Sequence, residues 1–196
     1  MQRTILDTPI LTPMLRPVAR LGLRLFGWNI EGGKPEEPKY VLVAAPHTSN
    51  LDAVVLVAMA AVLRIELFWM GKSTLFRAPF GWLMRWFGGI PVERRHSTDM
   101  VQRMAEIFRE EEELVVTIPP EATRGKSTRW KTGFYYIALG AGVPIALGFL
   151  DWGPKIGGIG PLFEPTGDIE ADMPQIQAFY AGMAGRHAEK FGDVRL

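Results

Sequence analysis

Cysteine is absent from the sequence, and histidine occurs only three times in 196 residues. The lack of cysteine excludes disulfide bonds, thiolate metal sites and a thiol nucleophile, and it fits a reducing compartment. The three histidines, His47, His96 and His187, are not at the spacing of metal ligands, so we expect no metal site.

A surplus of one charge is also missing, because 22 lysines and arginines face 21 acidic residues, for a net charge of +1. No global field therefore points to a nucleic-acid partner, and any anion site must come from a local cluster of cations. The apolar fraction of 47% is typical of a globular protein, and the length suits one domain with its own core.

Long hydrophobic runs are lacking as well. Residues 53–63 are too short to cross a bilayer, which takes about 20 apolar residues, and residues 132–150 are broken by Gly140, Gly142 and Pro144. The first twenty residues lack the uninterrupted apolar core of a signal peptide. We therefore expect a cytoplasmic chain without a transmembrane helix.

Short apolar strands alternate with helices, which predicts an α/β fold with a mostly parallel central sheet flanked by helices. Helices are expected near 13–26, 51–63, 79–87, 98–112, 133–141 and 173–190, the last opening with Asp172 and Gln175 at capping-box spacing. Strands are expected near 40–45, 66–70, 90–92, 114–118 and 144–149, with a possible hairpin near 155–163. Residues 1–30 would hold an amphipathic N-terminal helix, and residues 31–196 the single α/β domain.

Two segments favour contact with a membrane surface. In residues 13–26 three arginines share one helical stripe opposite an apolar side: Arg16, Arg20 and Arg24 against Leu15, Val18, Leu23, Leu25 and Phe26. A helix lying in a membrane interface shows this pattern, although a packed terminal helix with a solvated face shows it too. Residues 67–89 add seven aromatic residues among three cations, and Trp beside Arg is favoured at headgroup depth. Together they predict a peripheral protein on the inner face of the membrane.

The stretch APHTSNLD, residues 45–52, places His47 and Asp52 between two apolar runs. Residues five apart in one helix point about 140° apart, so the two can meet only if His47 lies in a loop and Asp52 in the first turn of the following helix, capped by Ser49 or Asn50. Asp52 could then accept from one ring nitrogen and leave the other basic. Such a pair acts on a substrate hydroxyl or on water. The spacing alone favours a simpler interpretation, a turn histidine beside an aspartate that complements the helix dipole.

Two clusters of cations follow strands. The segment GGIPVERR, residues 88–95, ends in the triplet Glu93, Arg94 and Arg95. An arginine fork at a strand end suits a phosphate, although exposed loop charges are the commoner role of such a triplet. Residues 124–131 hold four cations and no acid, which predicts a local anion site: Arg124, Lys126, Arg129 and Lys131. We expect Glu121, just before them, to position an arginine rather than to act as a base.

Taken in order, these segments resemble the glycerolipid acyltransferases related to bacterial 1-acylglycerol-3-phosphate acyltransferase. Four blocks of that family have counterparts here, over roughly residues 40–150: HTSNLD (47–52), GGIPVER (88–94), PEATR (120–124) and VPIAL (143–147). Three positions depart from the family pattern. Ala122 replaces a glycine, Pro46 stands where asparagine is common, and the last block lacks its second proline.

The resemblance implies that His47 is the general base on the acceptor hydroxyl and that Asp52 orients it. Arg94 and Arg124 become candidates for the acceptor phosphate, with Glu121 and Thr123 shaping that site. The extra lysines, Lys126 among them, could serve a different phosphate or the phosphates of coenzyme A.

The implied reaction moves an acyl group from acyl-CoA or acyl carrier protein, as co-substrate, to a lysophospholipid such as lysophosphatidate, a step of phospholipid biosynthesis. No other cofactor is expected. An apolar tunnel lined from residues 67–89 would set acyl length, and N–H groups near Ser49–Leu51 would stabilise the oxyanion. Two alternatives remain open: an ester or thioester hydrolase using the same pair, and a catalytically silent membrane lipid-binding module.

Overall fold

A seven-stranded sheet runs through the protein in the order β1–β7–β6–β2–β5–β3–β4. The computed structural model describes residues 3–9, 11–93, 97–123, 125–126, 129–191 and 194. The strands are β1 (Asn29–Glu31), β2 (Lys39–Ala45), β3 (Leu67–Lys72), β4 (Gly89–Val92), β5 (Leu114–Ile118), β6 (Ile145–Asp151) and β7 (Ile156–Phe163). Strands β6, β2, β5, β3 and β4 are parallel, whereas β7 is antiparallel to β6 and parallel to β1.

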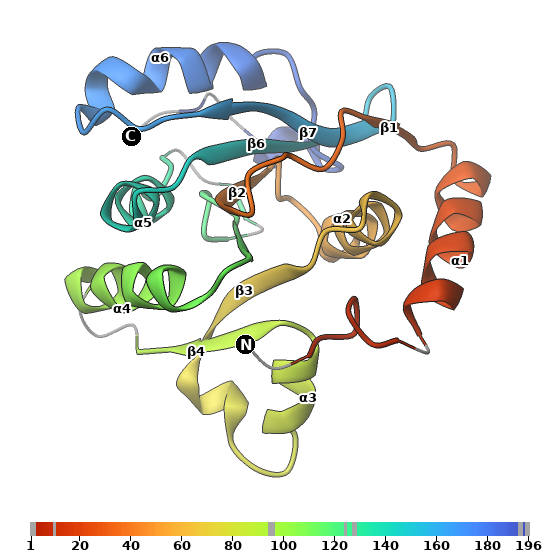
Figure 1. Ribbon diagram of the computed structural model, residues 1–196. Helices are drawn as coiled ribbons and strands as arrows, with labels where there is room; N and C mark the ends of the chain where they lie inside the picture. The colour runs from red at the N-terminus through yellow and green to blue at the C-terminus, as the bar shows by residue number, and fades with distance from the viewer. Residues whose placement is uncertain are drawn as a thin grey trace.

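Helices cover both faces of this sheet (Figure 1). The α-helices are α1 (Thr12–Leu25), α2 (Asn50–Leu63), α3 (Gly81–Trp86), α4 (Ser97–Glu110), α5 (Gly133–Ala141) and α6 (Ile169–Tyr180), and two short 3₁₀ helices are η1 (Ser73–Phe76) and η2 (Ala188–Lys190). Helices α4, α5 and α6 lie on one face, and α2 lies on the other with α1 outside it. The predicted α/β fold is thus confirmed.

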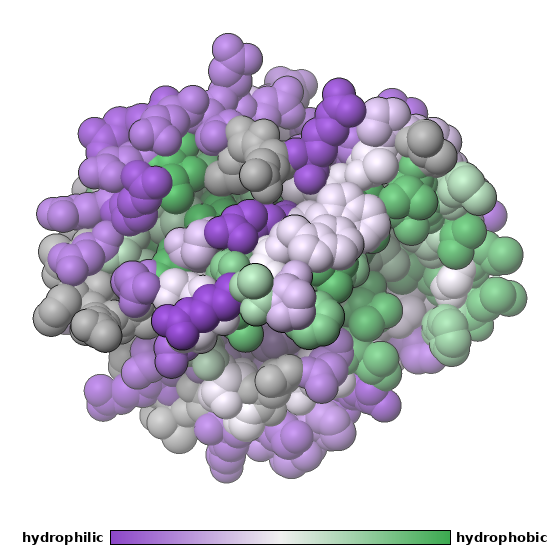
Figure 2. Space-filling model, turned by 90° about the horizontal axis from the view of Figure 1, so that it is seen from below, coloured by the Kyte–Doolittle hydropathy of each residue, from purple (hydrophilic) through white to green (hydrophobic). Residues whose placement is uncertain are grey.

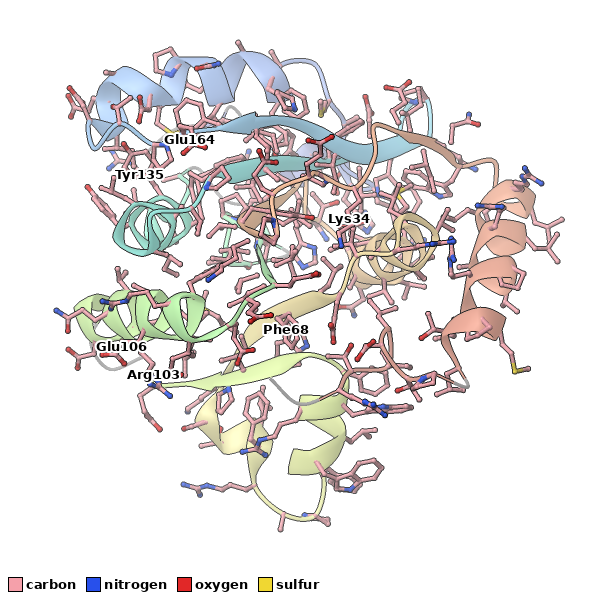
Figure 3. All side chains as sticks on the ribbon, viewed as in Figure 1. Lys34, Phe68, Arg103, Glu106, Tyr135 and Glu164 are labelled. Atoms are coloured by element: carbon pink, nitrogen blue, oxygen red, sulfur yellow. The ribbon has the colours of Figure 1, made fainter. Side chains whose placement is uncertain are left out.

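The central strands are buried on both sides because their side chains alternate between two apolar layers. In β2, Val41 and Val43 join the larger core beneath α4, α5 and α6, whereas Tyr40 and Leu42 join the smaller core beneath α2. Phe68 of β3 extends the larger core toward α4 (Figure 3). Full burial of each such side chain contributes about 1.5–3 kcal/mol, so the core fixes the strand ends from which the site is built.

The last helix differs from the prediction of 173–190. Asp168 caps α6 by accepting from Glu170 N at 3.1 Å and Ala171 N at 3.2 Å, so the helix begins at Ile169. Asp172, predicted to open the helix, is buried within it and accepts a 2.6 Å bond from the hydroxyl of Tyr135. The helix ends at Tyr180, and the chain beyond it folds back over the end of β6.

The possible hairpin near 155–163 is a single strand, β7, whose hairpin partner is β6. The turn between them occupies residues 152–155. Strand β1 is not apparent in the sequence, because three residues are too few to show a period of two. These differences leave the parallel centre of the sheet as expected.

Helix α1 packs against α2 through its small and apolar inner side. Leu23, which the amphipathic pattern put on the apolar side opposite the arginines, is buried beside Met59 of α2 and does not face outward. The outward apolar stripe consists of Met14, Val18, Leu21 and Leu25. Within the described ranges, no helix has the length and apolar character needed to span a bilayer.

Candidate active site

The loop after β2 carries His47, and the first turn of α2 carries Asp52. The chain leaves β2 at Ala45, and Ser49 caps α2 by accepting from Leu51 N at 3.1 Å. In return Asp52, the third residue of the helix, accepts from Ser49 N at 2.7 Å, which completes a capping box. The structure thus has the predicted arrangement, with His47 in the loop and Asp52 in the helix.

His47 and Asp52 face each other at an ion-pair distance. His47 Nδ1 lies 3.7 Å from Asp52 Oδ2, whereas a charge-assisted hydrogen bond would measure about 2.7–2.9 Å. The gap has a cause, because Oδ2 already accepts from the main-chain N–H groups of Thr48 and Ser49, both at 2.7 Å. The aspartate therefore acts on the ring through its charge, which favours a proton on Nδ1.

A third donor completes the surroundings of Asp52. The indole Nε1 of Trp152 donates to Oδ1 at 2.9 Å, so both carboxylate oxygens are held although the residue is only 2% exposed. Trp152 follows β6, the neighbour of β2 in the sheet. A buried carboxylate held by three donors is fixed in position, as a residue that orients a base must be.

Glu121 is bound to the main chain of the histidine loop. Its Oε1 accepts from His47 N at 2.9 Å, and its Oε2 is also buried, with no partner among the described residues. Burial raises the pKa of Glu121 to about 7; the bond from His47 N opposes that rise, and the charge of Asp52 adds to it. Among the described residues, the bond of Glu121 holds the loop that carries His47, and its predicted role in positioning an arginine stays untested because Arg124 lies outside those residues.

Replacing Glu121 with glutamine should remove a pH dependence of stability. Because the folded pKa of about 7 lies above the ordinary 4.5, the folded state binds the proton more tightly, and stability falls as pH rises from about 4.5 to 7. The loss should reach about 3 kcal/mol above pH 7. Glutamine keeps an oxygen for His47 N and does not titrate, so urea unfolding at pH 5 and pH 8 should show a flatter dependence.

The matched control is Glu36→Gln, which changes an exposed carboxyl and should keep the wild-type pH dependence. If the unfolding free energies of Glu121→Gln and Glu36→Gln depended on pH in the same way, Glu121 would not be the source of the pH dependence.

A cavity of about 1470 Å³ opens beside the pair and is walled mainly by apolar side chains. His47 and Asp52 line it at the strand ends, and its apolar walls include Ala53, Leu56 and Val57 of α2 and Leu67, Trp69, Met70 and Phe87 of the segment 67–89. Residues 67–89 thus form part of the cavity wall, and their role in setting acyl length stays a prediction. The cavity can hold an extended apolar chain whose polar end lies at the histidine.

The N-terminal segment before α1 also forms part of the cavity wall, which sequence reasoning missed. Ile5 and Leu6 line the cavity, and Ile5 N donates to Trp86 O at 2.8 Å. Thr4 Oγ1 donates to Glu66 Oε1 at 2.6 Å, which fastens the segment to the start of β3. Burial raises the pKa of Glu66, and the hydrogen bond from Thr4 opposes this rise. No periodicity could reveal this short segment, because its role depends on which strands and helices it packs against.

Only some of the residues predicted to bind substrate line the cavity. Thr123 lines it and accepts from Gly125 N at 3.1 Å, whereas Lys126 is exposed and does not line it. Arg94 and Arg124 lie outside the described residues. Two lysines do line the cavity, Lys131 and Lys190, and the second comes from the C-terminal segment. Among the described residues, no three His, Asp or Glu side chains gather as metal ligands would.

Ala122, which departs from the glycine of the resembled family, has a left-handed backbone with a φ of 54°. That conformation costs a residue with a Cβ roughly 1–2 kcal/mol, and glycine adopts it freely. At this position alanine therefore carries a cost in stability that glycine would not.

Three comparisons with known proteins agree with one another. The Acyltransferase family model matches residues 29–146. The chain is 29% identical over 130 residues to the 1-acyl-sn-glycerol-3-phosphate acyltransferase of Haemophilus influenzae (62% of this chain, 53% of the relative). It is 27% identical over 130 residues to the enzyme of that name from Escherichia coli (62% and 52%). The matched part thus spans about half the length of these curated relatives.

Among solved structures, the fold is similar to that of the 1-acyl-sn-glycerophosphate (LPA) acyltransferase PlsC from Thermotoga maritima. The TM-score is 0.56 with 17% sequence identity, over 89% of this chain and 82% of that one. This likeness concerns the fold. The family match spans most of the sheet and includes His47, Asp52 and Glu121. The chain therefore belongs to the Acyltransferase family.

Proposed function

We propose that the protein transfers an acyl group from a thioester, on coenzyme A or acyl carrier protein, to a hydroxyl of a lysophospholipid. The observation that carries the proposal is His47 on the wall of a large apolar cavity, with a buried carboxylate 3.7 Å from its Nδ1. The names of the two curated relatives support lysophosphatidate as the acceptor. The cavity would hold the acyl chain, and Lys131 and Lys190 would face the polar end of a substrate.

In the proposed reaction Nε2 of His47 takes the proton of the acceptor hydroxyl while its oxygen attacks the thioester carbonyl carbon. The tetrahedral intermediate then collapses, the carbon–sulfur bond breaks, and the proton passes from His47 to the departing thiolate. The products are the ester and a free thiol, with no acyl-enzyme. Asp52 stabilises the imidazolium that forms in between, because its charge lies 3.7 Å from Nδ1.

The expected oxyanion donors near Ser49–Leu51 need correction. Ser49 N donates to Asp52, and Leu51 N donates to the hydroxyl of Ser49, so these two groups already serve the capping box. The start of α2 therefore orients the aspartate, and these two amides are not available for the oxyanion.

An acyl-transfer assay with labelled acyl-CoA and acyl carrier protein over a panel of lysolipids tests the function. Thioester consumption should depend on the lysolipid and should yield the acylated lipid, fastest with lysophosphatidate. Equal consumption with and without acceptor would make the protein a hydrolase. Lipid binding without turnover would make it a binding module.

Membrane association is part of the proposal because α1 presents an apolar stripe outward. Apolar side chains gather over the α1 side of the molecule at the right of Figure 2. Arg20 and Arg24 are exposed on the flank of that stripe, whereas Arg16 is half-buried. An apolar strip flanked by cations suits the headgroup region of an anionic membrane.

Replacing both Arg20 and Arg24 with glutamate should weaken binding to anionic vesicles at least about tenfold, since each cation near such a surface contributes about 1 kcal/mol. Vesicle co-sedimentation measures the change. Arg103→Glu is the matched control, because Arg103 is exposed on α4, on the other face of the sheet (Figure 3). If both proteins bound vesicles like the wild type, α1 would be a packed helix with a solvated face.

A further inference from the structure

Asp52, in the first turn of α2, is held by a residue that the family match does not reach. The match ends at residue 146, within β6, and Trp152 lies beyond it. The indole Nε1 of Trp152 donates to Asp52 Oδ1 at 2.9 Å. Residues 52 and 152 are a hundred positions apart, and they meet because β6 lies next to β2 in the sheet.

The indole of Trp152 is itself contacted by two side chains, and the main chain of Trp152 makes a further bond. The ring of Trp28 meets it edge to face at a centroid distance of 5.0 Å, and the guanidinium of Arg186 lies 5.4 Å from its centroid. Arg186 also donates to Ser49 Oγ at 3.4 Å, and Trp152 N donates to Ala184 O at 2.9 Å. Residues 184–186 thus contact both Trp152 and Ser49, the capping residue of α2.

The two carboxylate oxygens of Asp52 accept from different donors. Oδ2 takes the two main-chain bonds and faces His47, whereas Oδ1 takes only the indole bond among the bonds described. The side chain of Trp152 therefore fixes the rotation of the carboxyl plane. It also draws negative charge toward Oδ1 and away from the imidazole.

We propose that Trp152 is a positioning residue, which sets the orientation and the effective charge of Asp52 toward His47 and is itself held by Arg186. The proposal rests on the proposed function only for its kinetic consequence. The coupling between the indole N–H and His47 is a property of the folded protein and can be measured without turnover.

Other ionisable groups near His47 must be counted in any pH effect. Glu121 binds His47 N, and His187 donates its main-chain N–H to Thr48 Oγ1 at 3.2 Å. Lys131 and Lys190 line the same cavity. Arg186 lies over the indole and donates to Ser49. None of these groups is replaced in a Trp152→Phe variant, so a shift seen there reports the loss of the indole.

The experiment compares Trp152→Phe with wild type and with Trp28→Phe. The phenyl ring keeps most of the packing and removes the donor to Asp52. We expect kcat to fall about tenfold with KM within twofold of wild type, because the carboxyl plane is then no longer held in its orientation toward His47. Because the carboxylate then attracts the imidazolium more strongly, the pKa of His47 should rise, and the acidic limb of the kcat–pH profile should move to higher pH.

The variant Trp28→Phe replaces the neighbouring indole with a phenyl ring, which can still meet Trp152 edge to face, and it keeps the donor to Asp52. The acidic limb of its pH profile should therefore stay at the wild-type position. An unchanged kcat and an unchanged limb in Trp152→Phe would overturn the proposal. A lower kcat with an unshifted limb would also overturn it, since that is the mark of a structural defect.

A second measurement needs no variant at position 152. In the wild-type protein the indole N–H resonance of Trp152 should move with pH as His47 titrates, and this movement should vanish in His47→Gln. An indole signal that ignores His47 would overturn the proposal even in a fully active enzyme. A coupled signal in a protein without acyl transfer would instead overturn only the proposed function.

Discussion

Replacing His47 with alanine should lower kcat/KM for acyl transfer by roughly 10²–10⁴-fold, the usual contribution of a general base. The protein should stay folded, because the imidazole is 21% exposed on a cavity wall and fills no part of the core. The contact that fastens this residue to Glu121 uses the main-chain N–H, which alanine retains. Steady-state kinetics and thermal unfolding of the same preparation separate the two effects.

The matched control is His187→Ala. The ring of His187 is 43% exposed and lies 3.8 Å from Glu189, so its removal should leave kcat/KM near the wild-type value. A folded His47→Ala protein with full acyl-transfer activity would remove His47 from the mechanism. The acyl-transfer proposal would then need another base.

Asp52→Asn should damage both activity and stability, in contrast to His47→Ala. The carboxylate receives bonds from Thr48 N, Ser49 N and Trp152 Nε1, and the side chain is 2% exposed. An asparagine offers one acceptor oxygen and an NH₂ group, so at least one buried donor must face another donor. The unpaired group should cost about 1–3 kcal/mol of unfolding free energy.

The loss of charge beside His47 should lower kcat by roughly 10²-fold or more, because no carboxylate then stabilises the imidazolium. Urea unfolding and kcat at saturating substrate measure the two losses. Asp99→Asn is the control, since Asp99 also lies in the first turn of a helix but is exposed. Equal stability of Asp52→Asn and Asp99→Asn would show that the three bonds contribute little.

The strands of the parallel sheet could be predicted because each is a short apolar run bounded by polar or turn residues. The run at 114–118 coincides with β5, and the other central strands agree within two residues. The start of α6 could not be placed, because Asp168 and Asp172 both fit a cap. The choice between them depends on the bond from Tyr135, which lies on another helix.

The local part of the site could be predicted for a similar reason. Capping chemistry puts His47 in the loop and Asp52 in the first turn, and only six residues are needed to see it. The partners of Asp52 and His47 from distant segments, Trp152 and Glu121, depend on which strands are neighbours. The sequence shows that Trp152 directly follows an apolar strand. That places it at the end of a strand but does not show which residue it contacts.

The place of β6 beside β2 has a consequence for how this protein can be divided. A fragment that ends where the family match ends, at residue 146, would keep the blocks at 47–52 and 120–124. It would lose all but two residues of β6. Strand β2 would become an edge with unpaired N–H and C=O groups. Any truncation or split of the chain that is meant to preserve activity should therefore leave residues 145–163 whole.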